Sequence, residues 1–160
     1  MMHRTGIGYD LHRTARGRPL VLGGVRIPCD FGLTGHSDGD VVLHALCDAL
    51  LGAAGLGDIG ELFPDTDPAW KDADSQRFVA EVLRRVRWAG YVVRNVDIVI
   101  HAEQPKLAEH KPRIKALLAE MLGVTADAVG VKATTNEGLD AVGRGAAVAC
   151  WASVLLAEDE

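Results

Sequence analysis

Apolar and polar residues alternate near the start of the chain. Across residues 5–12, glycine, aspartate and histidine alternate with three apolar residues, namely Ile7, Tyr9 and Leu11. A period of two is typical of a β-strand, because successive side chains point to opposite faces. The pattern predicts a strand with one packed, apolar face and one bare face that carries Asp10 and His12.

Longer periods and capping residues predict three helices, over residues 37–54, about 74–90 and 112–122. Each prediction begins at Ser, Asp or Pro and ends at a glycine, which are common helix boundaries. Alternating apolar residues predict strands over residues 91–102, 129–134 and 146–156, and residues 21–27 resemble a short irregular hairpin around Gly23-Gly24. The order of elements predicts an α+β fold, in which helices pack on one face of a single mixed sheet.

Length and composition support one domain spanning residues 1–160. The chain has 160 residues, within the range of one compact domain, and it lacks internal repeats and low-complexity linkers. Only 5% of the residues are aromatic, so the core must consist mainly of small aliphatic side chains.

Charge and cysteine content exclude several classes of protein. The net charge of −5 argues against broad contact with nucleic acid or an anionic membrane. The longest uncharged apolar run, residues 146–157, is shorter than the ~20 residues that span a bilayer. The first ten residues lack a signal-peptide pattern, so we expect a cytoplasmic protein, or a plastid protein only if a transit segment has been removed. Three widely spaced cysteines, Cys29, Cys47 and Cys150, are predicted to be reduced core thiols.

The bare face of the first strand suggests a metal site. Asp10 and His12 are two residues apart, so their side chains project from the same face of the strand. His44, on the first predicted helix, can complete a three-ligand set with an open fourth position, as in catalytic zinc sites. The alternative is a polar strand end and a hydrogen-bonded core histidine. Asp48, four residues after His44 in an otherwise apolar stretch, favours the functional interpretation, because buried polar groups need partners.

Three further segments could bind phosphate or a polyol. His36 and Ser37 are expected at a helix N-terminus, which attracts anions, although these residues taken alone favour an ordinary helix cap. The loop over residues 57–68 mixes acidic and turn-forming residues and could wrap a polyol, or be a plain acidic surface loop. Residues 132–137 could hold a diphosphate and magnesium, or form a simple hydroxyl-stabilised turn.

Other candidates carry weaker signals. Arg144, between two glycines, could bind an anion or form a salt bridge. His3, His101 and His110 have no partner at ligand spacing, and we expect them on the surface.

Taken together, the motifs resemble those of the 2-C-methyl-D-erythritol 2,4-cyclodiphosphate synthase family of the non-mevalonate isoprenoid pathway. They are G-x-G-x-D-x-H at residues 6–12, G-H-S-D-G-D-x-x-x-H at 35–44, G-D-I-G-x-L-F-P-D-T-D-P at 57–68, P-K-L at 105–107, V-K-A-T-T-x-E at 131–137 and G-R-G at 143–145. The resemblance covers nearly the whole chain. It implies a homotrimer with active sites between subunits, one zinc ion per site and a second divalent cation, Mg²⁺ or Mn²⁺.

The resemblance also implies a reaction and a set of site residues. The reaction is a lyase step in which 4-diphosphocytidyl-2-C-methyl-D-erythritol 2-phosphate cyclises and releases CMP. The zinc ligands would be Asp10, His12 and His44, with Glu137 at the second cation, and His36 and Thr135 would stabilise the transition state. Substrate-binding positions would be Asp10, His12, His36, Ser37, Asp58, Ile59, Gly60, Phe63, Asp65, Asp67, Ala102, Lys106, Leu107, Ala108, Ala133, Thr134, Thr135, Glu137 and Arg144.

The chain departs from the family pattern after Glu137. Ala141 replaces an aromatic residue, and Ala146 replaces a glutamate that would pair with Arg144 near the trimer axis. The departure weakens the case for isoprenoid diphosphate binding in the central cavity and leaves the metal chemistry unaffected.

Two other functions compete with the synthase. They are a zinc phosphohydrolase that uses a metal-bound hydroxide, and a non-catalytic trimeric module that binds nucleotides or isoprenoid diphosphates. Because the substrate's own phosphate is already ionised, we expect the zinc to orient and polarise a diphosphate rather than to generate hydroxide.

Overall fold

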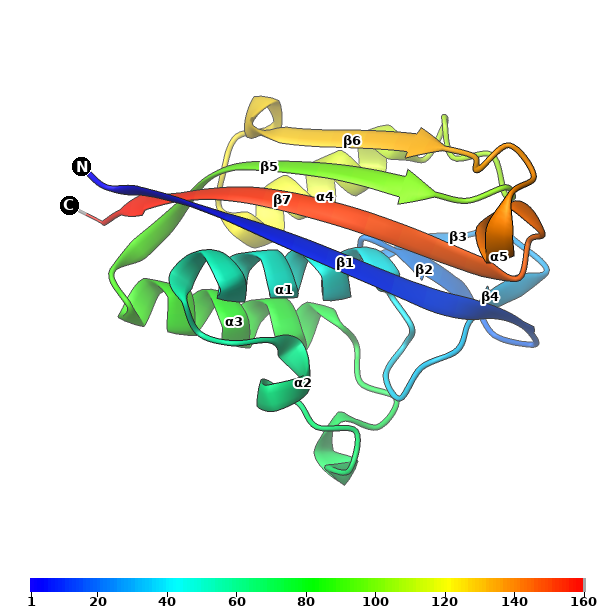
Figure 1. The fold of residues 1–160 in the computed structure, drawn as a ribbon, viewed down its shortest axis with the longest axis horizontal. Helices are drawn as coiled ribbons and strands as arrows, with labels where there is room; N and C mark the ends of the chain where they lie inside the picture. Colours follow the sequence, from blue (N-terminus) through cyan, green and yellow to red (C-terminus); the bar gives the residue numbers. More distant parts are fainter. Residues whose placement is uncertain (160) are drawn as a thin grey trace.

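The computed structural model describes residues 1–159, which form a five-stranded sheet backed by helices (Figure 1). The sheet has the order β4-β1-β7-β5-β6. Its strands are β1 (His3–Arg16), β4 (Phe31–Leu33), β5 (Tyr91–His101), β6 (Val129–Thr134) and β7 (Ala147–Glu158). The β5–β6 pair is parallel and the other pairs are antiparallel, which confirms the predicted mixed sheet.

Three longer helices pack on one face of this sheet, as predicted. They are α1 (Val41–Ala54), α3 (Gln76–Trp88) and α4 (Lys111–Leu122). The core between them includes the fully buried side chains of Val96, Ile98 and Ile100 on β5. The short elements are α2 (Ile59–Leu62), η1 (Pro68–Trp70), η2 (Ala126–Ala128) and α5 (Asp140–Gly143).

The prediction of a single sheet was incomplete, because the glycine pair makes a second one. Strands β2 (Leu20–Leu22) and β3 (Val25–Ile27) form a regular two-stranded hairpin. Its turn residues, Gly23 and Gly24, have φ angles of 61° and 79°, a left-handed conformation that glycine adopts without steric cost.

The packed face of β1 is the opposite of the predicted one. Ile7 is 68% exposed, and Tyr9 and Leu11 are nearly half exposed. The glycine face packs instead: a Cβ atom on Gly8 would lie 1.9 Å from the carbonyl oxygen of Ala45, and one on Gly6 would lie 2.0 Å from that of Ala49. The missing side chains therefore let the backbone of α1 contact β1 directly.

Helix α1 begins four residues later than predicted. Gly39 has a φ angle of 76°, and Asp40 is the N-cap, whose carboxylate accepts hydrogen bonds from the N–H groups of Val42 and Leu43. The same carboxylate accepts from the two glycine N–H groups of the β2–β3 turn, at 3.0 and 2.7 Å. Asp40 is fully buried, and burial raises its pKa to about 6. It joins the hairpin to the start of α1.

The cysteines differ in burial. Cys47 and Cys150 are buried and free, as expected of core thiols, whereas Cys29 is only partly buried.

No helix among residues 1–159 is long and apolar enough to cross a membrane.

Candidate functional site

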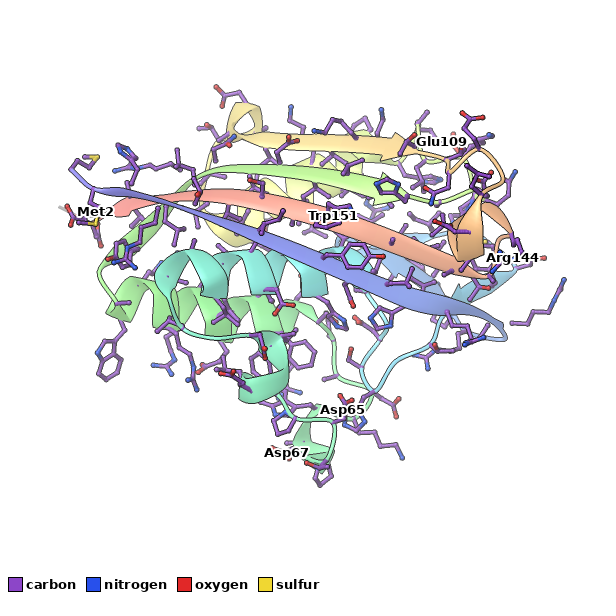
Figure 2. All side chains as sticks on the ribbon, in the orientation of Figure 1. Met2, Asp65, Asp67, Glu109, Arg144 and Trp151 are labelled. Carbon is purple, nitrogen blue, oxygen red and sulfur yellow. The ribbon has the colours of Figure 1, made fainter. Side chains whose placement is uncertain are left out.

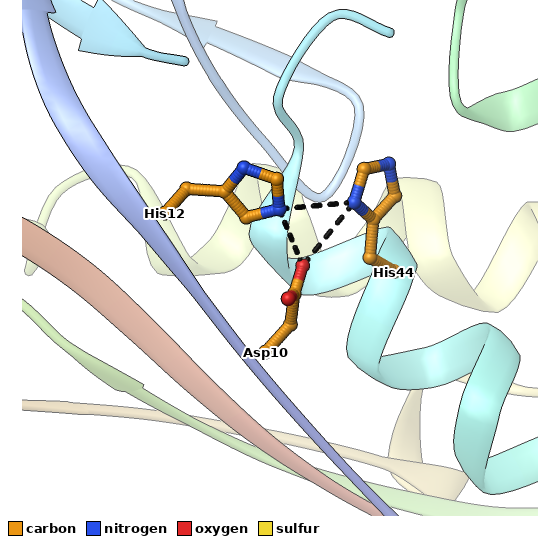
Figure 3. Close-up of side chains that lie close together, drawn as sticks. All are labelled: Asp10, His12 and His44. Atoms are coloured by element: carbon orange, nitrogen blue, oxygen red, sulfur yellow. Dashed lines mark hydrogen bonds and ion pairs between the residues drawn. The ribbon is translucent and has the colours of Figure 1, made fainter. Parts of the chain in front are cut away.

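The three predicted metal ligands lie together between β1 and α1 (Figure 3). His12 Nε2 is 2.6 Å from Asp10 Oδ2, and His44 Nδ1 is 3.2 Å from both of these atoms. All three side chains are partly buried. The close glycine contact between β1 and α1 brings the first turn of the helix, and with it His44, to the strand.

The donor set fits a cation. The Nδ1 atom of His12 contacts the backbone carbonyl of Thr34, which can only accept, so Nδ1 carries the proton and Nε2 presents its lone pair to the site. A carboxylate oxygen and imidazole nitrogens that converge on one point repel one another unless a proton or a metal ion lies between them. One aspartate and two histidines leave a fourth tetrahedral position open, which suits zinc.

The charges of the site shift its pKa values. Burial alone would raise the pKa of Asp10, but hydrogen bonds with His12 and His44, and their charges, lower it well below its usual range. Burial would lower the pKa of His12, but the hydrogen bond with Asp10 and its charge raise it above the ordinary value.

We therefore expect proton competition at the metal site. Zinc affinity should fall by up to about tenfold per pH unit once the pH drops below the raised pKa of His12, because a protonated imidazole cannot bind metal. In the metal-free protein the two shifts act oppositely. The stability contributed by Asp10 is lost as the pH falls through its lowered pKa, and that of His12 is lost as the pH rises through its raised pKa. Zinc titrations and thermal unfolding across pH measure both, and a pH-independent affinity would contradict this assignment.

A cavity of about 250 Å³ opens beside His12 and His44. Seven of the predicted substrate-binding residues are among its lining residues, namely His12, His36, Ser37, Ile59, Gly60, Phe63 and Asp65. Figure 2 shows Asp65 and Asp67 on the segment that projects below the helices. The two remaining acidic residues act as caps: the carboxylate of Asp58 accepts from the Glu61 N–H, and that of Asp67 accepts from the Ala69 N–H.

Two aromatic residues of this cavity were missed by the sequence reasoning. Trp70 and Phe78 line it, and the Phe78 ring stacks on Phe63 with centroids 4.6 Å apart. The Trp70 ring packs edge-on against both. Phe78 belongs to the apolar stripe of α3, so its pattern indicated core rather than cavity wall.

The prediction that His36 and Ser37 lie at a helix N-terminus was wrong. His36 and Ser37 lie in the loop before α1, and Asp40 already occupies the N–H groups that begin the helix. The ring of His36 instead contacts the backbone carbonyl of Asp67 through Nε2, at 3.2 Å. His36 thus joins the loop before α1 to Asp67, the residue that caps η1.

The carboxylate of Asp48 has a backbone partner. Its Oδ1 atom accepts a hydrogen bond from the N–H of Ile59 at 2.8 Å. Asp48 therefore holds α2, which carries Ile59 and Gly60 into the cavity, against α1.

A second cavity, of about 280 Å³, lies where β5 and β6 end and α4 begins. Carboxyl ends of parallel strands are common places for ligands. Seven predicted substrate-binding residues line it: Ala102, Lys106, Leu107, Ala108, Ala133, Thr134 and Thr135. Pro105 of the P-K-L motif lines it as well, together with Lys111, which the sequence did not indicate.

The chain matches known proteins over almost its whole length. The family model described as the YgbB family matches residues 3–157. The chain belongs to the YgbB family. The resemblance inferred from the motifs is confirmed.

Two similar curated proteins of the family have the same enzyme name. A 2-C-methyl-D-erythritol 2,4-cyclodiphosphate synthase of Cronobacter sakazakii is 56% identical over 153 residues, which cover 96% of each chain. One of Salinibacter ruber is 55% identical over 150 residues, which cover 94% of this chain and 96% of the relative.

Solved structures agree with this similarity. A 2C-methyl-D-erythritol-2,4-cyclodiphosphate synthase in a CDP-bound form is 42% identical, with a TM-score of 0.90, and the match covers 96% of this chain and all of that one. The bifunctional IspDF of Campylobacter jejuni is 43% identical, with a TM-score of 0.95 over 99% of this chain. The YgbB family chain spans only 43% of that longer protein.

The two cavities of the YgbB family chain lie far apart. Asp10 pairs with Cys150, Cys150 with Ile100, and Ile100 with Ala133, so these four residues form one row across the sheet. Three strand spacings separate Asp10 from Ala133, or about 14 Å. Cys150 and Ile100 are fully buried between them, so one chain does not bring the two groups of predicted residues together.

The loop between β6 and β7 holds the remaining candidates. Glu137 and Arg144 are exposed, and Figure 2 shows Arg144 beside α5. Lys132 does not face the second cavity but forms an ion pair with Asp97, at 2.6 Å. His101, predicted as an unpartnered surface residue, is partly buried and its Nδ1 lies 2.9 Å from Asn136 Oδ1.

The other two histidines expected on the surface differ. His3 is exposed, as predicted, whereas His110 is partly buried just before α4.

Proposed function

We propose that this protein is a 2-C-methyl-D-erythritol 2,4-cyclodiphosphate synthase, a phosphorus–oxygen lyase of isoprenoid precursor biosynthesis. The substrate is 4-diphosphocytidyl-2-C-methyl-D-erythritol 2-phosphate, and the products are the cyclic diphosphate and CMP. One observation carries the proposal: three converging metal-ligand atoms of Asp10, His12 and His44 lie beside a cavity, in a chain 56% identical to a named synthase.

The metal roles follow from the donor types. Asp10, His12 and His44 would hold Zn²⁺, and the exposed carboxylate of Glu137 would help to hold Mg²⁺ or Mn²⁺. When bound, the two ions would neutralise the diphosphate charge. His36 and Thr135 would stabilise the charge that develops in the transition state.

The reaction needs alignment more than a base. An oxygen of the 2-phosphate forms a bond to the β-phosphorus, and the bond from that phosphorus to the oxygen bridging the α-phosphate breaks, so that CMP leaves with the electron pair. The nucleophile is already ionised. The aromatic wall of Phe63, Trp70 and Phe78 makes one side of the first cavity apolar, which disfavours water as a competing nucleophile.

The geometry favours an active site shared between subunits. The first cavity suits the methylerythritol phosphate beside zinc, and the second, with Lys106 and Thr135, suits the cytidine diphosphate. We propose that a homotrimer brings the first cavity of one chain to the second cavity of its neighbour. The exposed apolar residues of β1 and Trp151 on β7 support such an assembly. Sedimentation analysis tests it, and a monomer that retains full activity would contradict it.

We also place the protein in the cytoplasm. The three free cysteines support a reducing compartment, where thiols persist unpaired.

Phosphorus NMR of purified protein with the substrate and Mg²⁺ tests the function. The expected result is the appearance of CMP and the cyclic diphosphate. A linear, hydrolysed product would identify a zinc phosphohydrolase instead. Binding of CDP without any turnover would identify a non-catalytic nucleotide-binding module.

Replacing Asp48 with alanine should weaken substrate binding. Without the carboxylate, the N–H of Ile59 loses its partner and α2 is no longer held at the cavity. We expect KM to rise about tenfold with a smaller change in kcat, and stability to fall by about 1 kcal/mol. Steady-state kinetics measure the split, and Glu61→Ala, which removes an exposed carboxylate of the same helix, is the control. An unchanged KM would show that α2 keeps its place without Asp48.

A further inference from the structure

Two buried serines lie behind His44, on the side away from the metal ligands. The Nε2 atom of His44 is 3.0 Å from the hydroxyl of Ser37 and 3.0 Å from that of Ser75. Ser75 is fully buried and Ser37 is 4% exposed. Figure 3 shows the Nε2 side of the His44 ring turned away from Asp10 and His12. The contacts of these hydroxyls determine which nitrogen carries the proton of the neutral imidazole.

The Ser75 hydroxyl donates its only proton to the carboxylate of Asp38. Ser75 donates its O–H to Oδ1 of Asp38 and its backbone N–H to Oδ2 of the same carboxylate, the latter at 2.9 Å. Oδ1 also accepts the N–H of Asp40, at 3.1 Å. An ionised carboxylate can only accept hydrogen bonds, so the direction of the Ser75 hydroxyl is fixed.

This direction selects one tautomer of His44. Because the hydroxyl of Ser75 has given its only proton to Asp38, it offers a lone pair to Nε2. A proton on Nε2 satisfies this lone pair and one of the Ser37 oxygen, and the Ser37 hydroxyl can then donate to the Ser75 oxygen, 3.4 Å away. A bare Nε2 could accept from Ser37 but would still face the Ser75 lone pair at 3.0 Å. With the proton on Nε2, Nδ1 presents its lone pair toward Asp10 and His12.

We propose that Asp38 and Ser75 are positioning residues that hold His44 in the tautomer with Nδ1 free to bind the metal. The inference rests on the proposed metal site. It gives His44 what the carbonyl of Thr34 gives His12, a hydrogen-bond acceptor behind the ring. The difference is that the acceptor behind His44 is a side chain from the residue before α3, so substitution can remove it.

Two variants separate this role from simple support of the fold. Ser75→Ala removes the acceptor. Asp38→Asn keeps the shape, but its amide group can donate to the Ser75 oxygen and free the hydroxyl proton to point at Nε2. Nitrogen-15 NMR of the metal-free protein, at a pH where imidazole is neutral, reports which nitrogen of His44 is protonated. Competition with a chelator gives the zinc affinity.

In the wild type we expect His44 protonated on Nε2. In Asp38→Asn and Ser75→Ala we expect the population to shift toward the Nδ1–H form and zinc affinity to fall about 10- to 100-fold. Asp74→Asn, which removes a neighbouring carboxylate that caps only Gln76, should change neither quantity. Thermal unfolding of each metal-free variant establishes that it is folded, and Asp38→Asn carries the test if Ser75→Ala does not fold.

Each outcome decides the inference. A wild-type tautomer in the folded variants overturns it, even if affinity falls, because the residues would then act only as structural support. A shifted tautomer with unchanged affinity overturns it as well. If the wild type binds no zinc, both the proposed function and this inference fail. If the wild type binds zinc but no more tightly than the two variants, only this inference fails.

Discussion

Replacing Asp10 with asparagine should abolish zinc binding and lower turnover at least about 1,000-fold. The carboxylate is the one anionic ligand of the site, and its Oδ2 atom lies within 3.2 Å of both histidine nitrogens. An amide oxygen carries no full charge, so the variant loses both a strong ligand and the attraction that offsets the dehydration of the metal. A loss of about 4 kcal/mol in transition-state stabilisation corresponds to that factor.

Metal analysis of the purified variant and the phosphorus NMR assay measure the two effects together. His3→Ala is the matched control, because His3 is an exposed histidine on the same strand, and it should keep metal and activity. Retention of zinc and turnover by Asp10→Asn would remove Asp10 from the ligand set.

Adding a single methyl group at Gly8 should disrupt the metal site by displacing α1, the helix that carries His44. The new Cβ atom would lie 1.9 Å from the carbonyl oxygen of Ala45, a distance that backbone atoms cannot accommodate without moving α1. We expect Gly8→Ala to cost about 3 kcal/mol or more in unfolding free energy. Because His44 moves with α1, zinc affinity should fall as well, although no ligand has been changed.

Gly52→Ala is the control for this prediction. Gly52 lies in α1 itself, and a Cβ atom there would meet nothing within 4 Å. Alanine is the better helix former, so this variant should gain about 0.5 to 1 kcal/mol. Denaturant unfolding of both metal-free variants gives the comparison. Equal stabilities would mean that α1 does not depend on the glycine face of β1.

Local patterns in the sequence were enough to predict most of the elements. Glycine at positions 55 and 123 ends α1 and α4 in left-handed conformations, as expected from the pattern. The alternation on β1 predicted a strand but not which of its faces packs, because a two-residue period does not show which element lies against either face. The packing depends on two small residues of α1, Ala45 and Ala49, whose backbone lies directly against the glycine face of β1.

The group that could hold a metal was predicted because Asp10 and His12 are two residues apart on one strand and His44 has a polar residue, Asp48, one turn away. The rest of the site depends on contacts between distant segments. Ser75 reaches a histidine 31 positions earlier, and Trp70 joins Phe63 only after the chain has turned through η1. The start of α1 was misplaced because Ser37 and Asp38 resemble a cap, while the cap is Asp40, whose partners include the distant turn at Gly23.

The pairing of the first strand with the last has a consequence for how the protein is made. His3 lies opposite Ala157, and the pairing runs continuously to Arg13 and Ala147. Asp10 and His12 are therefore on a strand whose main partner, β7, is synthesised after the other strands of the sheet. Contacts of such long sequence separation slow folding. We expect the proposed metal site to form only after β7 has been synthesised and has inserted between β1 and β5, because this insertion fixes the position of β1.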